Sequence, residues 1–278
     1  MLRVNNLFHE ESLDYQNTGK YLNEREEEIE CLQDILRCCM VNDEKLECDI
    51  EELYAQEVEP GVLLMDWLFS GAGTGDYELR RLLMELLQTF ADYEEEKDYR
   101  IDISLGEQFG CIWNESGYWA CRRKILERLH KPQEFYEFMK SCFINSQFSE
   151  RVRSALREIK DFPLHTAEIV HNLSLLNDEA LDIYQKHQGN EAEAMRELAS
   201  KALECSGDPK HKHLLKFPFT YIIEENGEPC SCVAEIACEP HMKLIRRDSD
   251  LRIYFYWRDS RIGEGEKVLI GKIGGHPY

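Results

Sequence analysis

The first two thirds of the chain repeat apolar residues with the period of amphipathic helices. Between Tyr21 and Met40, Leu22, Ile29 and Leu36 recur seven residues apart, and glutamate or aspartate fills many positions between them. The same periodicity predicts further helices over residues 76–90, 118–130, 133–144, 149–160, 165–186 and 190–205. We therefore expect residues 1–205 to form a mainly α-helical domain with an acidic, solvated surface.

After Pro209 the pattern changes to one typical of β-strands. Phe217–Ile223 is rich in aromatic and β-branched residues, and the turn signal Glu225–Glu228 follows it, which predicts a hairpin. The expected strands after the turn cover residues 231–238, 242–245, 251–257 and 267–273. Residues 206–278 should thus form a small antiparallel β-meander, and the whole chain an α+β protein.

The charge is distributed unevenly along the chain. The net charge is -21, but residues 206–278 hold 11 basic and 11 acidic side chains, so all the excess negative charge lies in residues 1–205. A strongly acidic surface disfavours contact with nucleic acid and suits a protein partner. An anionic partner such as RNA is therefore expected only at residues 206–278.

The cysteines and the apolar segments indicate the compartment. No run of apolar residues approaches the length of a membrane span, and the start of the chain lacks the apolar core of a secretory signal. The eleven cysteines are scattered, and Cys38 and Cys39 are adjacent, which fits reduced thiols in helix cores. We expect a cytoplasmic protein with no membrane contact.

One group of soft ligands raises the question of a metal. Cys230, Cys232, Cys238 and His241 lie within twelve residues, and tetrahedral zinc accepts such a set. Their spacing is irregular and lacks paired Cys-x-x-Cys knuckles, so ordinary half-buried thiols are the alternative. A structural zinc is thus one hypothesis, and no other cofactor is required.

The last forty residues bring cationic and aromatic side chains together. The segments Glu239-Pro-His-Met-Lys-Leu, Asp250-Leu-Arg-Ile-Tyr and Lys272-Ile-Gly-Gly-His-Pro-Tyr278 resemble the C-terminal sheet of the RelE/ParE toxin superfamily. That family has a basic Lys-Leu strand, an Arg-bearing strand and a last strand that ends near a histidine and a tyrosine. The helical pair that the family places before the Lys-Leu strand is replaced here by the predicted hairpin.

The resemblance implies a ribonuclease site. Fixed cations would stabilise the extra negative charge of the transferring phosphoryl group, and Lys, His or Tyr would move protons during attack by a 2′-hydroxyl. The catalytic candidates are Lys243, Arg252, Lys272, His276 and Tyr278. The candidates for binding RNA are Arg246, Arg247, Tyr254 and Arg258.

Two classes of function follow. The first is a toxin or phage-defence effector that acts on RNA or the ribosome and is restrained by its acidic helical domain, whose carboxylates compete with phosphates. The second is a non-catalytic scaffold or adaptor that binds protein partners, with a zinc-stabilised form as one variant. In this second class the cations are only the solvent-facing members of an alternating sheet.

Overall fold

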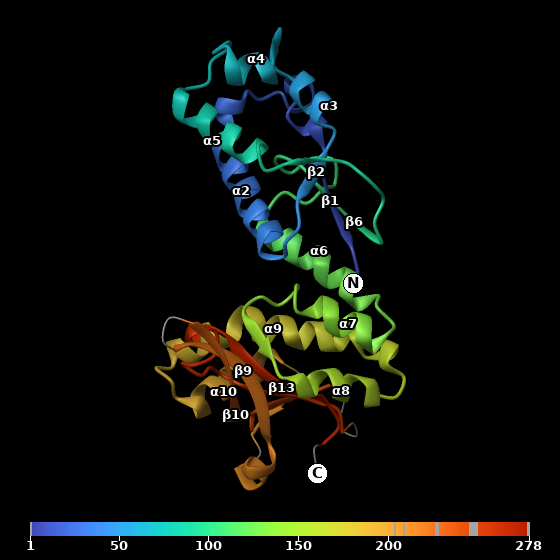
Figure 1. Ribbon diagram of the computed structural model, residues 1–278, viewed down its shortest axis with the longest axis vertical. Helices are drawn as coiled ribbons and strands as arrows, with labels where there is room; N and C mark the ends of the chain where they lie inside the picture. The colour runs from blue at the N-terminus through green and yellow to red at the C-terminus, as the bar shows by residue number, and fades with distance from the viewer. Residues whose placement is uncertain (1, 203, 208, 226–227, 245–249, 277–278) are drawn as a thin grey trace. The chain divides into compact units, whose positions relative to one another are not determined.

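The computed structural model describes residues 2–202, 204–207, 209–225, 228–244 and 250–276 (Figure 1). The chain divides into two compact units, here called the N-terminal unit (Leu2–Lys124) and the C-terminal unit (from Ile125 onward). The boundary expected near residue 205 lies inside the C-terminal unit, within a strand of its sheet.

A parallel sheet forms the centre of the N-terminal unit. Its strand order is β5-β2-β1-β6, and all three pairings are parallel. These strands are β1 (Val4–Phe8), β2 (Leu46–Cys48), β5 (Ala91–Asp92) and β6 (Tyr99–Ile103). The prediction of a mainly helical domain is therefore wrong. Strands this short, largely buried in β1 and β2, show no apolar-polar alternation, whereas the helices between them show clear periodicity.

The helices of this unit connect its strands. The connecting elements are α1 (Tyr15–Thr18), α2 (Glu26–Val41), α3 (Ile50–Ala55), the hairpin β3 (Glu57–Glu59) and β4 (Val62–Leu63), α4 (Leu64–Phe69) and α5 (Tyr77–Leu87). Helix α6 (Glu115–Glu127) follows the sheet. The predicted N-cap of α5 is confirmed, because the Asp76 carboxylate accepts a hydrogen bond of 2.8 Å from the backbone N–H of Leu79.

A buried arginine ties the sheet to the start of α2. The chain passes from β1 to β2 on one side of β1 and later adds β6 on the other side. Ligands of open α/β sheets often bind beside such a reversal of strand order. Here Arg25, only 1% exposed, donates to the carbonyls of Ser12 (2.7 Å) and Leu105 and to the Glu28 carboxylate (2.6 Å). Arg25 and its hydrogen-bond partners thus occupy this position beside the sheet.

Arg25→Met should destabilise the protein, because two buried carbonyls and a carboxylate lose their donor. The expected loss is about 3 kcal/mol of unfolding free energy. Arg37→Met removes an exposed ion pair with Asp34 on the same helix and serves as the control. Urea unfolding followed by circular dichroism measures both, and equal midpoints for the two variants would show that Arg25 does not hold the sheet.

A five-stranded sheet forms the centre of the C-terminal unit. Its order is β7-β13-β12-β11-β8, with β7 parallel to β13 and the other pairings antiparallel. The strands are β7 (Ser146–Phe148), β8 (Cys205–Ser206), β11 (His241–Lys243), β12 (Arg252–Tyr256) and β13 (Val268–Gly274). A separate C-terminal meander was also a wrong prediction, because β7 joins the sheet from about 120 residues earlier in the chain.

Four helices belong to the same unit (Figure 1). They are α7 (Pro132–Met139), α8 (Glu150–Glu158), α9 (Thr166–Lys186) and α10 (Glu191–Lys201). All four were predicted within a few residues of their ends, since each shows the helical period. Among the described residues, no helix is both long and apolar enough to cross a bilayer.

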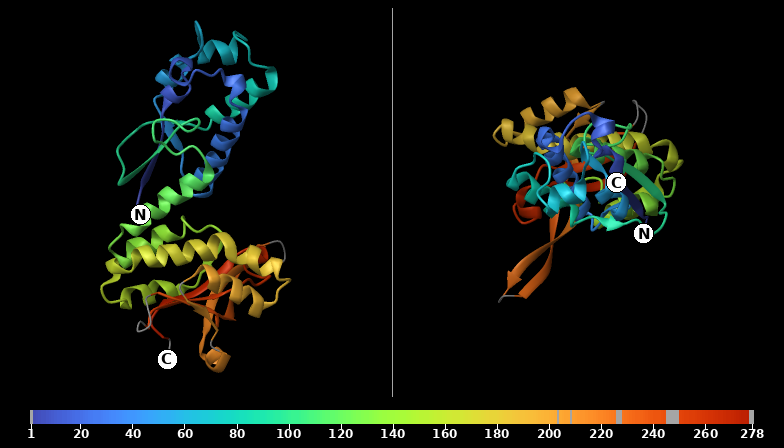
Figure 2. Two further views of the ribbon diagram at one scale, coloured as in Figure 1. Left: turned by 180° about the vertical axis from the view of Figure 1, so that it is seen from behind. Right: turned by 90° about the horizontal axis from the view of Figure 1, so that it is seen from above.

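The predicted hairpin is confirmed as a two-stranded sheet of its own. Strands β9 (Lys216–Glu225) and β10 (Glu228–Ala237) pair along their whole length and project from the body of the C-terminal unit (Figure 2). At its base the hairpin buries Phe217 and Phe219 in a core cluster with Tyr254 and Leu269. The hairpin therefore covers part of one face of the five-stranded sheet.

Gly271 makes this packing possible. The register of β12 and β13 shifts between Tyr254 and Phe255, which leaves Gly271 as an extra residue on β13. A Cβ atom at this position would lie 2.4 Å from the Phe217 ring and 2.9 Å from the Cys238 sulfur. Only a residue without a side chain lets the hairpin approach the sheet so closely.

Gly271→Ala should destabilise the C-terminal unit by about 1–3 kcal/mol, because the new methyl group overpacks the base of the hairpin. Gly275→Ala is the control, since nothing lies within 4 Å of a Cβ at that position. Thermal unfolding monitored by tryptophan fluorescence compares the two. If Gly271→Ala unfolds at the same temperature as Gly275→Ala, the close approach is not a constraint.

Candidate functional site

Strand register brings three predicted cations to one face of the five-stranded sheet. Lys243 on β11 lies opposite Arg252 on β12, and Lys272 on β13 lies opposite Tyr254, two residues beyond Arg252. Side chains opposite one another, or two apart on a strand, share a face. We call this group of Lys243, Arg252, Tyr254 and Lys272 the basic face. Ile253, which points the other way, is completely buried.

The cations differ in their partners. Lys243 forms an ion pair of 2.5 Å with Glu204, which neutralises much of its charge. Arg252 donates to the carbonyl of Asp250 at 2.9 Å, while its buried Nε has no hydrogen-bond partner among the described residues. An arginine held this way keeps its charge, which suits an anionic ligand, although the buried Nε itself is not accessible to one. Gly274 lies opposite Arg252 on β13 and adds no side chain beside it.

Tyr254 holds a histidine beside the cations. Its hydroxyl lies 3.0 Å from Nδ1 of His276, and Tyr254 itself is only 1% exposed. The ring of His241 packs beside Tyr254 with centroids 5.3 Å apart, and its Nε2 lies 3.2 Å from the Ser206 hydroxyl. The hydroxyl of Tyr254 thus orients the imidazole of His276, a side chain able to transfer protons near neutral pH.

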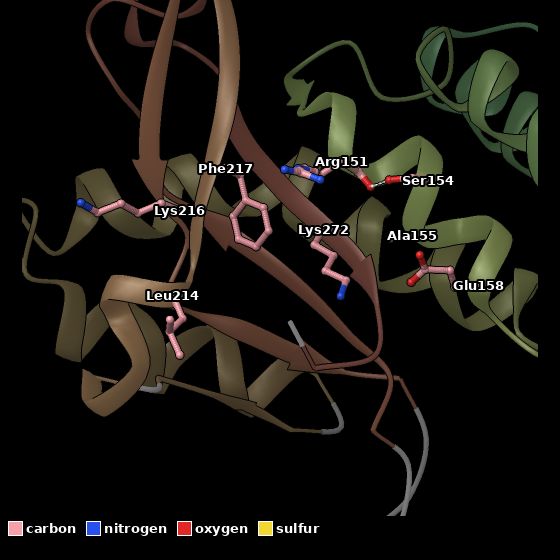
Figure 3. A pocket seen from close by; sticks show the side chains of 8 residues that line it. All are labelled: Arg151, Ser154, Ala155, Glu158, Leu214, Lys216, Phe217 and Lys272. Atoms are coloured by element: carbon pink, nitrogen blue, oxygen red, sulfur yellow. Dashed lines mark hydrogen bonds between the residues drawn. The ribbon is translucent and has the colours of Figure 1, made fainter. Parts of the chain in front are cut away.

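Lys272 belongs both to the basic face and to a pocket. This pocket of about 320 Å³ lies between α8, the start of β9 and β13 (Figure 3), and we call it the α8–β13 pocket. Its lining residues are Arg151, Ser154, Ala155, Glu158, Leu214, Lys216, Phe217 and Lys272. Burial lowers the pKa of Lys272, and the negative charge of Glu158 partly offsets that effect.

Sequence reasoning missed the α8 side of this pocket. Arg151, Ser154 and Glu158 are spaced three and four residues apart, so they share one helix face, while Val152 and Leu156 on another face are buried. This spacing was visible in the sequence as the polar side of an amphipathic helix. Nothing in the sequence placed that side next to β13.

Several predicted site residues lie elsewhere. Arg258 is exposed beyond the end of β12, with its guanidinium 5.9 Å from the centre of the Tyr184 ring. Arg246, Arg247 and Tyr278 fall outside the described residues. The candidate site therefore rests on Lys243, Arg252, Tyr254, Lys272 and His276.

The zinc candidates are spread along the hairpin and the sheet. Cys230 is exposed on the distal half of β10 with Cys232 on the same face, whereas Cys238 is completely buried at the hairpin base. His241 contacts Ser206 on β8. Within the part of the chain that the structure describes, no three His, Cys, Asp or Glu side chains form a group suited to a metal.

Comparison of the chain with protein-family models, curated proteins and solved structures gives no match. The functional proposal therefore depends on the sequence and on the geometry of the C-terminal unit.

Glu158→Gln should lower the pKa of Lys272 further, because it removes the carboxylate that favours the charged amine. Glu264→Gln, which does not line the pocket, should leave the titration of Lys272 unchanged. Nitrogen-15 NMR of the lysine ammonium groups follows the titration. An identical Lys272 titration curve in Glu158→Gln would show that the two groups do not interact.

Proposed function

We propose that the C-terminal unit binds RNA on the basic face and cleaves it, as a RelE-like ribonuclease in a toxin or phage-defence effector. The observation that carries this proposal is the meeting of Lys243, Arg252 and Lys272 on three adjacent strands. Their positions were singled out by the resemblance of the last forty residues to the RelE/ParE superfamily. Their convergence on one face is what a phosphodiester site requires.

The charge distribution also supports an RNA site in this unit. Residues 2–124 carry 29 acidic and 12 basic side chains, whereas residues 125–278 carry 25 and 21. The C-terminal unit thus holds most of the cations and little of the net negative charge. Three of these cations, Lys243, Arg252 and Lys272, share the basic face, and phosphate contact is a short-range interaction.

The proposed reaction begins with the 2′-hydroxyl of a ribose. Its oxygen forms a bond to the adjacent phosphorus while its proton passes to a base, and the bond from phosphorus to the 5′-oxygen breaks as that oxygen receives a proton. In this scheme Arg252 stabilises the added negative charge on the phosphoryl oxygens. His276, oriented by Tyr254, exchanges a proton with the substrate. The products are a 2′,3′-cyclic phosphate and a 5′-hydroxyl end.

A second candidate function has one observation in its favour. The hairpin exposes Ile222 (72%) and Val233 (63%), which lie on the face opposite the buried Phe217 and Phe219. Exposed apolar side chains on a projecting hairpin suit contact with another protein. In this alternative the C-terminal unit is an interaction module, and its cations have no catalytic role.

Arg252→Ala should lower the single-turnover rate of RNA cleavage by the full chain roughly a hundredfold or more, because the transition state loses a fixed cation. Arg196→Ala removes an exposed arginine from α10 and is the charge-matched control. Both free single-stranded RNA and RNA on translating ribosomes serve as substrates. Growth arrest on expression should likewise disappear with Arg252→Ala and persist with Arg196→Ala.

Two results would contradict the proposal. One is cleavage by Arg252→Ala at the wild-type rate. The other is an absence of cleavage by the wild-type chain with both substrates, which would leave the interaction module as the better account.

A further inference from the structure

The α8–β13 pocket combines donors from two elements that are distant in sequence. Arg151 comes from α8, and Lys272 comes from β13 more than one hundred residues later, while the Ser154 hydroxyl already donates to the backbone carbonyl of Arg151 at 3.1 Å. Figure 3 shows the ammonium of Lys272 and the carboxylate of Glu158 extending into the space between β13 and α8. Lys216 lines the wall with its stem while its ammonium points away, so it is not counted among the donors.

The two cations of this pocket are not held in ion pairs within the described part of the chain. Neither Arg151 nor Lys272 forms an ion pair with a described carboxylate, although the chain holds 54 acidic residues. Among the described residues, the Lys272 ammonium donates one hydrogen bond, a long one of 3.5 Å to the carbonyl oxygen of His276. A half-buried ammonium with so weak a contact has lost hydration, and the charge of Glu158 offsets that loss only in part. An anion in the pocket would supply a closer partner of opposite charge.

We infer that the α8–β13 pocket binds a phosphoryl group. Arg151 on α8 and Lys272 on β13 line the pocket from two different elements, and two cationic donors suit a phosphoryl group with its several acceptor oxygens. Glu158 supplies an acceptor for a hydroxyl attached to the same ligand, such as that of a ribose. Leu214 and Phe217 add an apolar wall. This combination fits a nucleotide.

The phosphoryl group can come from a free nucleotide or from an RNA strand on the basic face. Lys272 belongs to both the pocket and the basic face, so a strand bound on the face is adjacent to the pocket. Binding of an RNA strand rests on the proposed function, whereas binding of a free nucleotide does not. In either case an anion in the pocket competes with other ligands for Lys272.

Isothermal titration of the full chain with inorganic phosphate tests the site. Arg151→Ala and Lys272→Met should each weaken phosphate binding about tenfold or more, because each removes a charge-assisted hydrogen bond. Lys272→Arg, which keeps the charge, should retain most of the affinity. Arg153→Ala is the matched control on α8, since Arg153 contacts Gln133 and Glu137 of α7 and does not line the pocket.

Further titrations distinguish the two sources. Tighter binding of 5′-AMP than of inorganic phosphate, lost in Arg151→Ala, supports a free nucleotide. Tighter binding of a short single-stranded RNA than of 5′-AMP, also lost in Arg151→Ala, supports a phosphate of the strand. The inference is overturned if none of the three probes saturates a site, or if Arg151→Ala and Lys272→Met bind phosphate as wild type does.

The outcome for the pocket is separable from that for the ribonuclease. Phosphate binding that depends on Arg151 in a chain that cleaves no RNA supports the pocket and removes the catalytic proposal. If RNA cleavage depends on Arg252 while phosphate binding does not depend on Arg151, the catalytic proposal is supported and the pocket proposal is not.

Discussion

The pairing of β12 with β11 and β13 is the constraint on which the candidate site depends. Side chains alternate between the two faces of a strand, so a slip of one residue would exchange Arg252 and Ile253 between the two faces. The burial of Ile253 opposes such a slip. The irregularity after Tyr254 then gives β13 one extra residue, Gly271, and keeps Lys272 opposite Tyr254. Packing of the hairpin on Gly271 thus supports the same register that assembles the cations.

The N-terminal and C-terminal units offer an anion different electrostatic surroundings. The N-terminal unit holds most of the net negative charge, and its buried Arg25 is fully used by internal contacts. In the C-terminal unit Lys243 is paired with Glu204, whereas Arg252, Arg151 and Lys272 form no ion pair with a described carboxylate. At physiological salt such groups act over about 8 Å. Recognition of an anion is therefore a local property of the groups around β13.

The sequence predicted local structure well and long-range assembly poorly. The helical periods of α5, α8 and α9 and the strand patterns of β9 and β12 were strong enough to place these elements within a few residues. The parallel sheet of the N-terminal unit was missed because strands such as Leu46–Cys48 are too short to show a period. Lys243, Arg252 and Lys272 were singled out by the resemblance of the last forty residues to the RelE/ParE superfamily. Arg151 and Glu158 were not, because only tertiary packing brings α8 to β13.

The most direct measurement of the central claim is photo-crosslinking of a single-stranded RNA containing 4-thiouridine to the full chain, followed by mass-spectrometric mapping of the adducts. The account predicts adducts concentrated on β11, β12 and β13 and on the pocket side of α8, and their loss when an excess of unmodified RNA is added. Adducts confined to residues 2–124, or no adducts that unmodified RNA displaces, would contradict it.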